Sequence, residues 1–253
     1  MNYFFGIDNH NLKCNLQIPK FQNRINTPNQ YLLFKAKINN NKWEVKIVEQ
    51  FQSNKYFFDI EKKYINNDTI FFLAKQNEVN SLNQEKLLNL NNFTDTTPPF
   101  RANLEVSIEN GGFSSFQSDY PFAMTKKKGS IVTNVSLISN EDADKNFIFL
   151  KNIYQYPVNE KFFAYFVNLK TKLIEEKIEL KTNYTNCIEL KKSLIKPEIF
   201  LTTERFLGIP MYVSIKNKHI SFEHTHPLHT YILSEDKYKK IEELKIEINE
   251  IIN

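Results

Sequence analysis

The residues best suited to chemistry are four histidines that lie close together near the C-terminal end of the chain. They fall in the run His219-Ile-Ser-Phe-Glu-His224-Thr-His226-Pro-Leu-His229, and only His10 among the five histidines lies elsewhere. Imidazole is the commonest metal ligand among side chains and the one that most readily exchanges protons near neutral pH. The run is therefore the first candidate for a functional site.

The spacing within this run predicts a three-histidine metal site. In an extended strand alternate side chains share a face, so His224 and His226 point the same way with Cα atoms roughly 6.5–7 Å apart. Pro227 then interrupts the strand, which allows the chain to bring His229 toward the same point. Three nitrogen ligands with a position left open for water or substrate are typical of catalytic zinc or non-haem iron. We expect His224, His226 and His229 to bind such a divalent metal.

Two other residues of the run are the candidates for catalysis. Glu223 and His219 fall on the opposite face of a regular strand, so they reach the metal only if a bulge or another segment brings them round. Distant carboxylates that could complete a site are Glu204, Glu235 and Asp236. The structural alternative is that the histidines are ordinary half-buried side chains that bond to backbone groups at a strand end.

A second polar and aromatic cluster follows the dipeptide Asn110-Gly111. Gln117, Asp119 and Tyr120, flanked by phenylalanines, offer hydrogen-bonding groups beside flat apolar rings, as sugar recognition requires. The guanidinium of Arg101 can bind carboxylates or phosphates with two parallel hydrogen bonds. We expect these four side chains to bind a small polar molecule or glycan. The structural alternative is a hairpin, which the dipeptide favours, with Arg101 bracing an interdomain junction.

Net charge and missing motifs narrow the function classes. The 253 residues carry 33 basic and 29 acidic side chains, a net charge of +4. This mild excess is far from the strongly basic composition of nucleic-acid-binding proteins, so no nucleic-acid partner is expected. With only five glycines, the chain has no Gly-x-x-x-x-Gly-Lys, Gly-x-Gly-x-x-Gly or Gly-x-Ser-x-Gly motif. Their absence argues against nucleotide-dependent kinases, dinucleotide dehydrogenases and α/β-hydrolases.

Composition also indicates the cellular compartment. Residues 1–16 lack a basic segment followed by an apolar one, so no signal peptide is expected. No window approaches 18 continuous apolar residues, so no membrane span is expected either. Cys14 and Cys187 are far apart and have no nearby partner cysteine. A reducing, cytoplasmic setting fits these observations best.

Alternating apolar residues predict short strands through most of the chain. The expected strands cover residues 31–38, 43–51, 56–60, 69–74, 104–108, 113–124, 130–138, 146–153, 161–169, 172–180, 199–206, 210–216 and 219–226. One short helix is expected at 81–90, with Ser81 as its cap. Pro98 and Pro99 follow an asparagine-rich stretch and cannot continue a helix. We therefore place a boundary there, between domains 1–97 and 98–253.

The C-terminal tail has the pattern of an amphipathic helix. From Tyr238 onward, Ile241, Leu244, Ile248 and Ile251 recur at helical spacing, with lysine and glutamate between them. Such a stripe usually packs against a sheet, although it could instead bind a partner.

Together these patterns predict a mainly β protein. Its C-terminal domain is expected to be a β-sandwich or barrel with a terminal amphipathic helix, preceded by a smaller β-rich domain. The expected function is a metal-dependent site that acts on a small polar or sugar-derived substrate. The alternative is a non-catalytic module for carbohydrate binding or structural assembly, and a homo-oligomer is compatible with either. Fold alone does not decide, because β-sandwiches host both classes.

Overall fold

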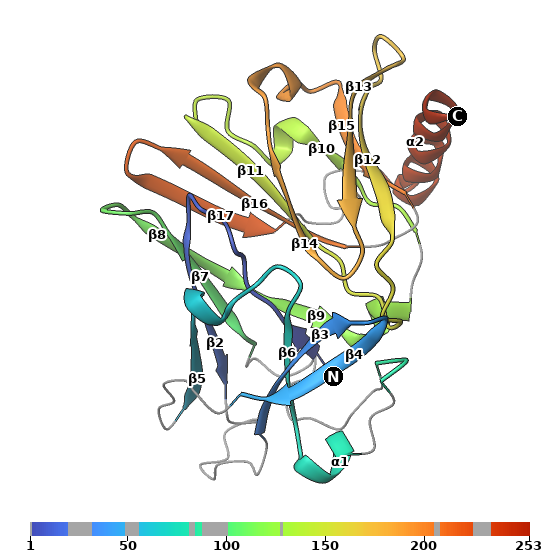
Figure 1. Cartoon of the computed structure of the whole chain (residues 1–253). Helices are drawn as coiled ribbons and strands as arrows, with labels where there is room; N and C mark the ends of the chain where they lie inside the picture. The colour runs from blue at the N-terminus through green and yellow to red at the C-terminus, as the bar shows by residue number, and fades with distance from the viewer. Residues whose placement is uncertain are drawn as a thin grey trace.

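The protein is mainly β, as the computed structural model of the chain shows (Figure 1). The structure describes residues 2–19, 32–48, 56–80, 84–87, 101–126, 129–204, 208–224 and 234–253. In this part of the chain the strands form four antiparallel sheets, two built mainly from the N-terminal half and two from the C-terminal half.

The first two sheets have the strand orders β4-β3-β6-β1-β9 and β5-β2-β7-β8. The strands of the first are β1 (Asn2–Phe4), β3 (Leu32–Asn39), β4 (Lys42–Ile47), β6 (Ile70–Ala74) and β9 (Asp119–Pro121). Those of the second are β2 (Lys13–Pro19), β5 (Phe57–Glu61), β7 (Asn103–Ser107) and β8 (Phe113–Gln117). Short helical segments beside them are η1 (Lys62–Tyr64), α1 (Gln76–Asn80) and η2 (Phe122–Lys126).

The other two sheets have the strand orders β10-β15-β12-β13 and β14-β11-β16-β17. The strands of the third sheet are β10 (Val132–Asn134), β12 (Lys161–Asn168), β13 (Leu173–Lys181) and β15 (Ile199–Thr203). Those of the fourth are β11 (Lys145–Lys151), β14 (Thr185–Glu189), β16 (Ile209–Lys216) and β17 (His219–His224). The helical segments of this half are η3 (Val135–Leu137), η4 (Lys192–Leu194) and α2 (Lys237–Ile252).

Strand pairing crosses the predicted domain boundary between residues 97 and 98. β9 pairs with β1 at the edge of the first sheet, and β7 pairs with β2 in the middle of the second. Residues 103–121 therefore lie in the same sheets as the strands of the N-terminal half.

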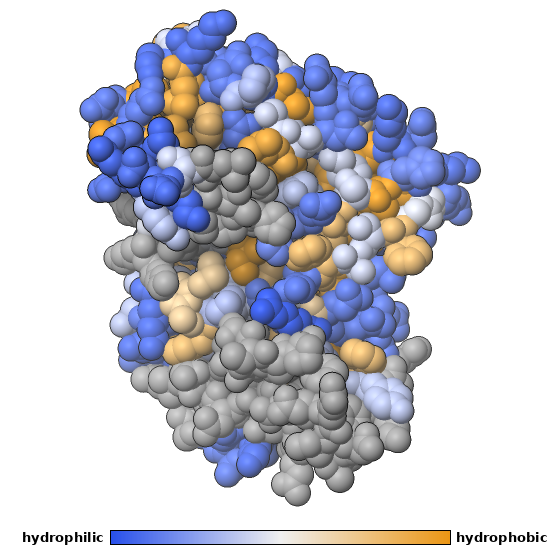
Figure 2. Space-filling view, turned by 180° about the vertical axis from the view of Figure 1, so that it is seen from behind, coloured by the Kyte–Doolittle hydropathy of each residue, from blue (hydrophilic) through white to orange (hydrophobic). Residues whose placement is uncertain are grey.

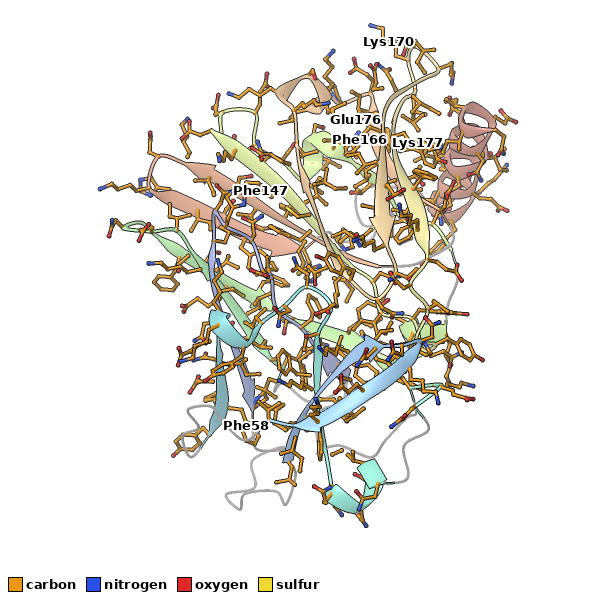
Figure 3. The ribbon with its side chains drawn as sticks, viewed as in Figure 1. Phe58, Phe147, Phe166, Lys170, Glu176 and Lys177 are labelled. Atoms are coloured by element: carbon orange, nitrogen blue, oxygen red, sulfur yellow. The ribbon has the colours of Figure 1, made fainter. Side chains whose placement is uncertain are left out.

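The strand β11 is buried on both faces and joins two cores. Phe147 and Phe149 enter the core shared with the N-terminal sheets, whereas Ile148 and Leu150 enter the core between the third and fourth sheets. Figure 3 labels Phe147 on β11 and Phe166 on the facing β12. Burying each such side chain stabilises the folded state by roughly 1.5–3 kcal/mol. Because β11 contributes side chains to both cores, the fourth sheet is the layer on which both halves pack.

The C-terminal helix covers the opposite face of the third sheet. Ile248 of α2 is buried with Tyr165 and Val167 of β12, and Leu244 packs against the same cluster (Figure 1). These leucine and isoleucine positions are those of the apolar stripe, so the prediction of an amphipathic C-terminal helix is confirmed. The prediction of a mainly β protein with sandwich packing is confirmed too.

Several elements differ from the sequence-based expectation. The strands β1, β2 and β14 were not predicted. β1 has only three residues and β14 only five, whereas the alternation along β2 was overlooked. Residues 84–87 form a turn and not the predicted helix; residues 81–83 and 88–90 lie outside the described part of the chain. The short helix lies just before this segment, as α1.

One lysine is fully buried where the two halves meet. The side chain of Lys151, at the end of β11, has no exposed surface, and its Nζ donates to the backbone oxygen of Asn67 at 3.2 Å. The same oxygen accepts a hydrogen bond from the backbone nitrogen of Thr185 at 2.8 Å. Burial lowers the pKa of Lys151 to about 7, although the nearby Asp68 acts in the opposite direction. The amine therefore exchanges its proton near neutral pH.

The outer surface mixes polar and apolar areas. On the side seen in Figure 2, hydrophobic residues among the coloured ones gather in a band across the middle, and hydrophilic residues cover most of the upper part. None of the described helices is long and apolar enough to cross a membrane.

Replacing the buried lysine should remove a pH dependence of stability. Between pH 7 and pH 10 the folded state holds fewer protons than the unfolded state, whose lysine pKa is about 10.4, so the free energy of unfolding should rise across this range. We expect Lys151→Met to abolish a rise of about 2–4 kcal/mol in urea unfolding measured at intervals from pH 6 to pH 10.

The matched control is Lys145→Met, which removes an exposed lysine from the same strand. This variant should keep the rise. An unchanged rise in Lys151→Met would show that the buried amine does not set the pH dependence.

Candidate functional site

One sheet turns a polar face away from the core. In β5-β2-β7-β8, alternation sends Leu16 and Leu104 into the core and turns Gln17 and Asn103 to the other side. We call this side the polar face. Its half-buried or exposed side chains are Lys13, Asn15, Gln17, Phe57, Asp59, Glu61, Asn103, Glu105, Ser107, Phe113, Ser115 and Gln117.

A row of polar side chains crosses all four strands of this face. The strand register places Asp59 beside Gln17, Gln17 beside Asn103, and Asn103 beside Gln117. The amide nitrogen of Gln17 donates to Asp59 at 3.0 Å, and the amide nitrogen of Asn103 donates to the oxygen of Gln17 at 3.4 Å. These two hydrogen bonds orient the side chains of Asp59, Gln17 and Asn103.

The neighbouring row has an unsatisfied acceptor. Asn15 lies between Glu61 and Glu105 in the register, and its Oδ1 is buried without a hydrogen bond from the described residues. A buried oxygen of this kind costs about 1–3 kcal/mol unless water or a ligand supplies a donor. Phe113, at one corner of the same face, is 69% exposed. The face thus combines directional polar groups with an exposed aromatic ring.

A corner of the chain brings three of the predicted binding residues together. Between β8 and β9 the chain passes from one N-terminal sheet to the other through Ser118, whose backbone nitrogen donates to Ala102 at 3.2 Å. The guanidinium of Arg101 donates to Gln117 Oε1 at 2.6 Å, and its Nε lies 3.8 Å from Asp119 Oδ2. Arg101 thereby links the end of the polar row to the corner.

Asp119 is the most perturbed acid at this corner. Its side chain is 6% exposed, and its Oδ1 accepts a hydrogen bond from the backbone nitrogen of Ala102 at 3.2 Å. Its Oδ2 is buried without a hydrogen bond from the described residues. Burial raises the pKa of Asp119 to about 7, while the Ala102 bond and Arg101 act in the opposite direction. Burial dominates because the separation from Arg101 is too long for a hydrogen bond.

The fourth predicted binding residue lies elsewhere. Tyr120 is fully buried in the core, and burial raises the pKa of its hydroxyl. Phe116, which flanks the same segment, points to the inner side of β8 and packs edge-on against Phe222 with ring centroids 6.5 Å apart. Both side chains therefore stabilise the fold and present no surface on the polar face.

The predicted metal ligand His224 is half-buried at the end of β17. It shares a face with Ile220 and Phe222, as the alternation predicted, and its ring meets Phe116 edge-on with centroids 4.4 Å apart. The adjacent edge strands β8 and β17 are also joined by a hydrogen bond of 3.2 Å from the nitrogen of Phe222 to Ser114 Oγ.

The two predicted catalytic residues lie on the other face of β17. Glu223 accepts a hydrogen bond from the hydroxyl of Tyr212 at 3.1 Å, and His219 is exposed at the start of the strand. Five residues of extended chain put His219 roughly 16 Å from His224. The structure thus does not bring Glu223 or His219 to the imidazole of His224.

Two of the three predicted metal ligands, His226 and His229, lie outside the described residues. Among the residues that the structure does describe, no group of three or more histidine, cysteine, aspartate or glutamate side chains could hold a metal ion. The zinc or iron site therefore stays a prediction.

Comparison with protein-family models, with curated proteins and with solved structures gives no match. The function must therefore be argued from the side chains themselves.

Sequence reasoning missed three of the four residues of the polar row. Gln17, Asp59 and Asn103 come from strands up to 86 positions apart in the sequence, and only the pairing of β2 with β5 and β7 makes them neighbours. A usable signal was the alternation of polar with apolar residues along β2, where Cys14, Leu16 and Ile18 are buried.

Replacing the buried carboxyl at the corner should change the pH profile of stability. Between pH 4 and pH 7 the folded state holds more protons than the unfolded state, so the free energy of unfolding should fall as pH rises. Asp119→Asn removes this group, and the stability of the variant relative to the parent should grow by about 2–4 kcal/mol from pH 4 to pH 8. Urea unfolding at several pH values measures the difference.

Asp142→Asn, at an exposed turn, controls for the loss of one negative charge. A constant difference between Asp119→Asn and the parent over this range would contradict the assignment.

Proposed function

We propose that this chain is a binding module whose polar face recognises a glycan. The observation that carries the proposal is the row formed by Asp59, Gln17, Asn103 and Gln117 on one sheet face. Hydrogen bonds join Gln17 to Asp59 and to Asn103, Arg101 holds Gln117, and the same face bears an exposed aromatic ring. Sugar hydroxyls need donors and acceptors at fixed positions, and sugar C–H faces need a flat apolar surface.

The hydrogen-bonding capacity left on this face suits hydroxyl groups. Each amide has two donor hydrogens and an acceptor oxygen, so Gln17 and Asn103 keep unused capacity after bonding to one another. Because donors and acceptors alternate, the row fits neutral hydroxyls better than a charged ligand.

The aromatic ring gives the face its apolar contact. Phe113, Ser115 and Gln117 alternate on β8 and share the outward side, so the exposed ring adjoins the polar rows. Binding a sugar here would remove apolar surface from water without requiring the sheet to move.

Removing this ring should weaken glycan binding. We expect Phe113→Ala to lower the affinity for the best-binding member of a panel of soluble gluco-, manno- and galacto-oligosaccharides by roughly fivefold, equivalent to about 1 kcal/mol. Isothermal titration calorimetry measures the affinity of the parent and of the variant.

Tyr238→Ala is the control, because Tyr238 is 67% exposed on α2, far from the polar face. Its affinity should equal that of the parent. Saturable binding to no member of the panel, or equal affinities for Phe113→Ala and the parent, would contradict the proposal.

A metal site at the end of β17 is the second candidate function. Its support is the position of His224: the ring is half-buried, held edge-on by Phe116, and followed in sequence by His226 and His229. Three imidazoles would suit zinc or iron, and zinc would lower the pKa of a bound water molecule, which suits a metal-dependent enzyme acting on a small polar or sugar-derived substrate.

Metal analysis tests this second function. Protein purified after reconstitution with zinc or with ferrous iron under anaerobic conditions should hold close to one equivalent, and His226→Ala should lower that content at least tenfold. His10→Ala, which removes the histidine outside the run, should leave it unchanged. Less than a tenth of an equivalent in the parent protein would exclude the site.

A further inference from the structure

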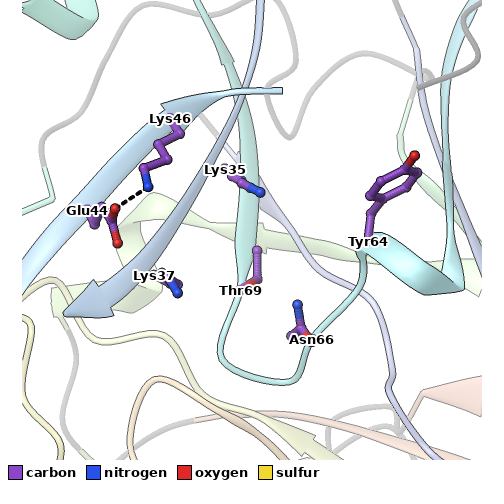
Figure 4. A pocket seen from close by; sticks show the side chains of 7 residues that line it. All are labelled: Lys35, Lys37, Glu44, Lys46, Tyr64, Asn66 and Thr69. Atoms are coloured by element: carbon purple, nitrogen blue, oxygen red, sulfur yellow. Dashed lines mark ion pairs between the residues drawn. The ribbon is translucent and has the colours of Figure 1, made fainter. Parts of the chain in front are cut away.

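The outer side of the β3–β4 hairpin carries a small basic pocket. Asn40 and Asn41, with φ of 49° and 57°, make the two-residue turn, which is of the kind that fixes hairpin register. That register sets Lys35 opposite Lys46 and Lys37 opposite Glu44. The pocket has a volume of about 140 Å³ and is lined by Lys35, Lys37, Glu44, Lys46, Tyr64, Asn66 and Thr69 (Figure 4).

Two of the three lysines form no ion pair with the described residues, although Lys37 acts electrostatically on the carboxylate of Glu44 opposite it. Lys46 forms an ion pair of 2.5 Å with Glu44, the one carboxylate among the described residues of the lining. Lys35 and Lys37 make no ion pair or side-chain hydrogen bond with the described residues, and Figure 4 shows both on the β3 side of the pocket. Three ammonium groups and one carboxylate leave a net lining charge of +2.

The opposite wall is firmly held. It comprises η1 and the turn before β6, where the nitrogen of Thr69 donates to the oxygen of Asn66 at 3.0 Å. Lys62 anchors η1 by bonding to the backbone oxygens of Asn9 and Leu12 at 2.7 and 2.6 Å. A pocket between a hairpin of fixed register and an anchored turn is preformed, which reduces the entropic cost of binding.

The turn is anchored from its other side as well. The side chain of Asn67 bonds to both the nitrogen and the oxygen of Asp8, at 2.9 and 2.8 Å, and its backbone oxygen bonds to Lys151 and Thr185. The position of Asn66 and Tyr64 thus depends on the junction between the two halves of the molecule.

We propose that this pocket binds a phosphate group, either as inorganic phosphate or at the end of a small phosphorylated molecule. The dianion balances the lining charge of +2, and Lys35 and Lys37 supply charge-assisted hydrogen bonds. Tyr64 and Asn66 add neutral hydrogen-bonding groups from the opposite wall. The volume is well below the roughly 300–1,000 Å³ of sites for larger ligands, so it accommodates one phosphate with a small substituent.

The charges nearby do not cancel this preference. Lys63 pairs with Glu61 at 3.1 Å, and its Nζ lies 5.0 Å from the ring centroid of Tyr64, which leaves the net charge near the pocket unchanged. Asp68 accepts a hydrogen bond from the hydroxyl of Thr69 at 3.2 Å and also lies close enough to the amine of Lys151 to act on it electrostatically. Lys35 and Lys37 therefore remain the cations available to an anion.

Calorimetric titration of the full chain at low ionic strength tests the proposal. The probes are inorganic phosphate and glycerol 1-phosphate, with sodium chloride at matched ionic strength as the reference. We expect saturable binding of at least one phosphate probe and none of chloride. If glycerol 1-phosphate binds more tightly, the site is assigned to phosphorylated molecules. If inorganic phosphate binds as tightly or more tightly, the site is assigned to inorganic phosphate. Either result supports the proposal.

Variants locate the bound anion. Lys35→Met or Lys37→Met should weaken phosphate binding about tenfold, as expected for loss of one charge-assisted hydrogen bond. Glu44→Gln should strengthen it several-fold, because the carboxylate that repels the anion and occupies Lys46 is removed. Lys42→Met is the matched control: it makes the same change on the same hairpin outside the pocket, and it should bind like the parent.

Two results would overturn the proposal. One is the absence of saturable binding by both phosphate probes, or a heat of binding that chloride reproduces at equal ionic strength. The other is equal weakening by Lys42→Met and Lys35→Met, which would show general attraction to the hairpin instead of a site. Neither result bears on the glycan proposal, which concerns a different sheet.

Discussion

The sheet β5-β2-β7-β8 buries the side chains of only one of its two faces, and the proposed glycan-binding function depends on this constraint. Leu16, Ile60 and Leu104 are fully buried in the core that also receives Phe147 and Phe149 of β11. A shift of one residue in any of these strands would exchange core and surface side chains, so the core fixes the register. The register in turn determines which polar side chains are neighbours on the other face, so no further interaction is needed to bring them together.

The junction between the two halves is the second constraint. Asn67 connects the segment around Asp8 to Thr185 and Lys151 of the fourth sheet, and it precedes the strand that supports the basic pocket. A buried lysine with one hydrogen bond is a costly way to join two surfaces. The hydrogen bond from its amine to Asn67 forms only when the turn at Asn67 is in place, which ties the geometry of the pocket to the packing of the whole molecule.

The sequence predicted those elements whose structure depends on residues that are close together in the chain. The pair Asn110-Gly111 gives a hairpin turn, with Asn110 at a φ of 53°, and the tail gives the helix α2. Arg101, Gln117 and Asp119 lie together because only 18 positions separate them and a single corner brings them together.

Features set by distant pairing could not be predicted in this way. Gln17 and Asp59 meet only because β2 pairs with β5, and no local pattern states which strands pair. The burial of Lys151 depends on the contact between the two halves, and its own strand reads as a continuous apolar run that ends in a charged residue. In the histidine run, the local spacing correctly indicates that His224 shares a face with Ile220 and Phe222. It does not indicate that the ring of Phe116, from a distant strand, lies against His224.

Chemical-shift mapping with a bound oligosaccharide tests the central claim most directly. In ¹H–¹⁵N spectra of the full chain titrated with the tightest-binding sugar, the amides of β2, β7 and β8 on the polar face should shift together and saturate with one affinity. The Nε2 signals of Gln17 and Gln117 should move with them. Shifts confined to β17 or to the β3–β4 hairpin, with the polar face unperturbed, would contradict the account.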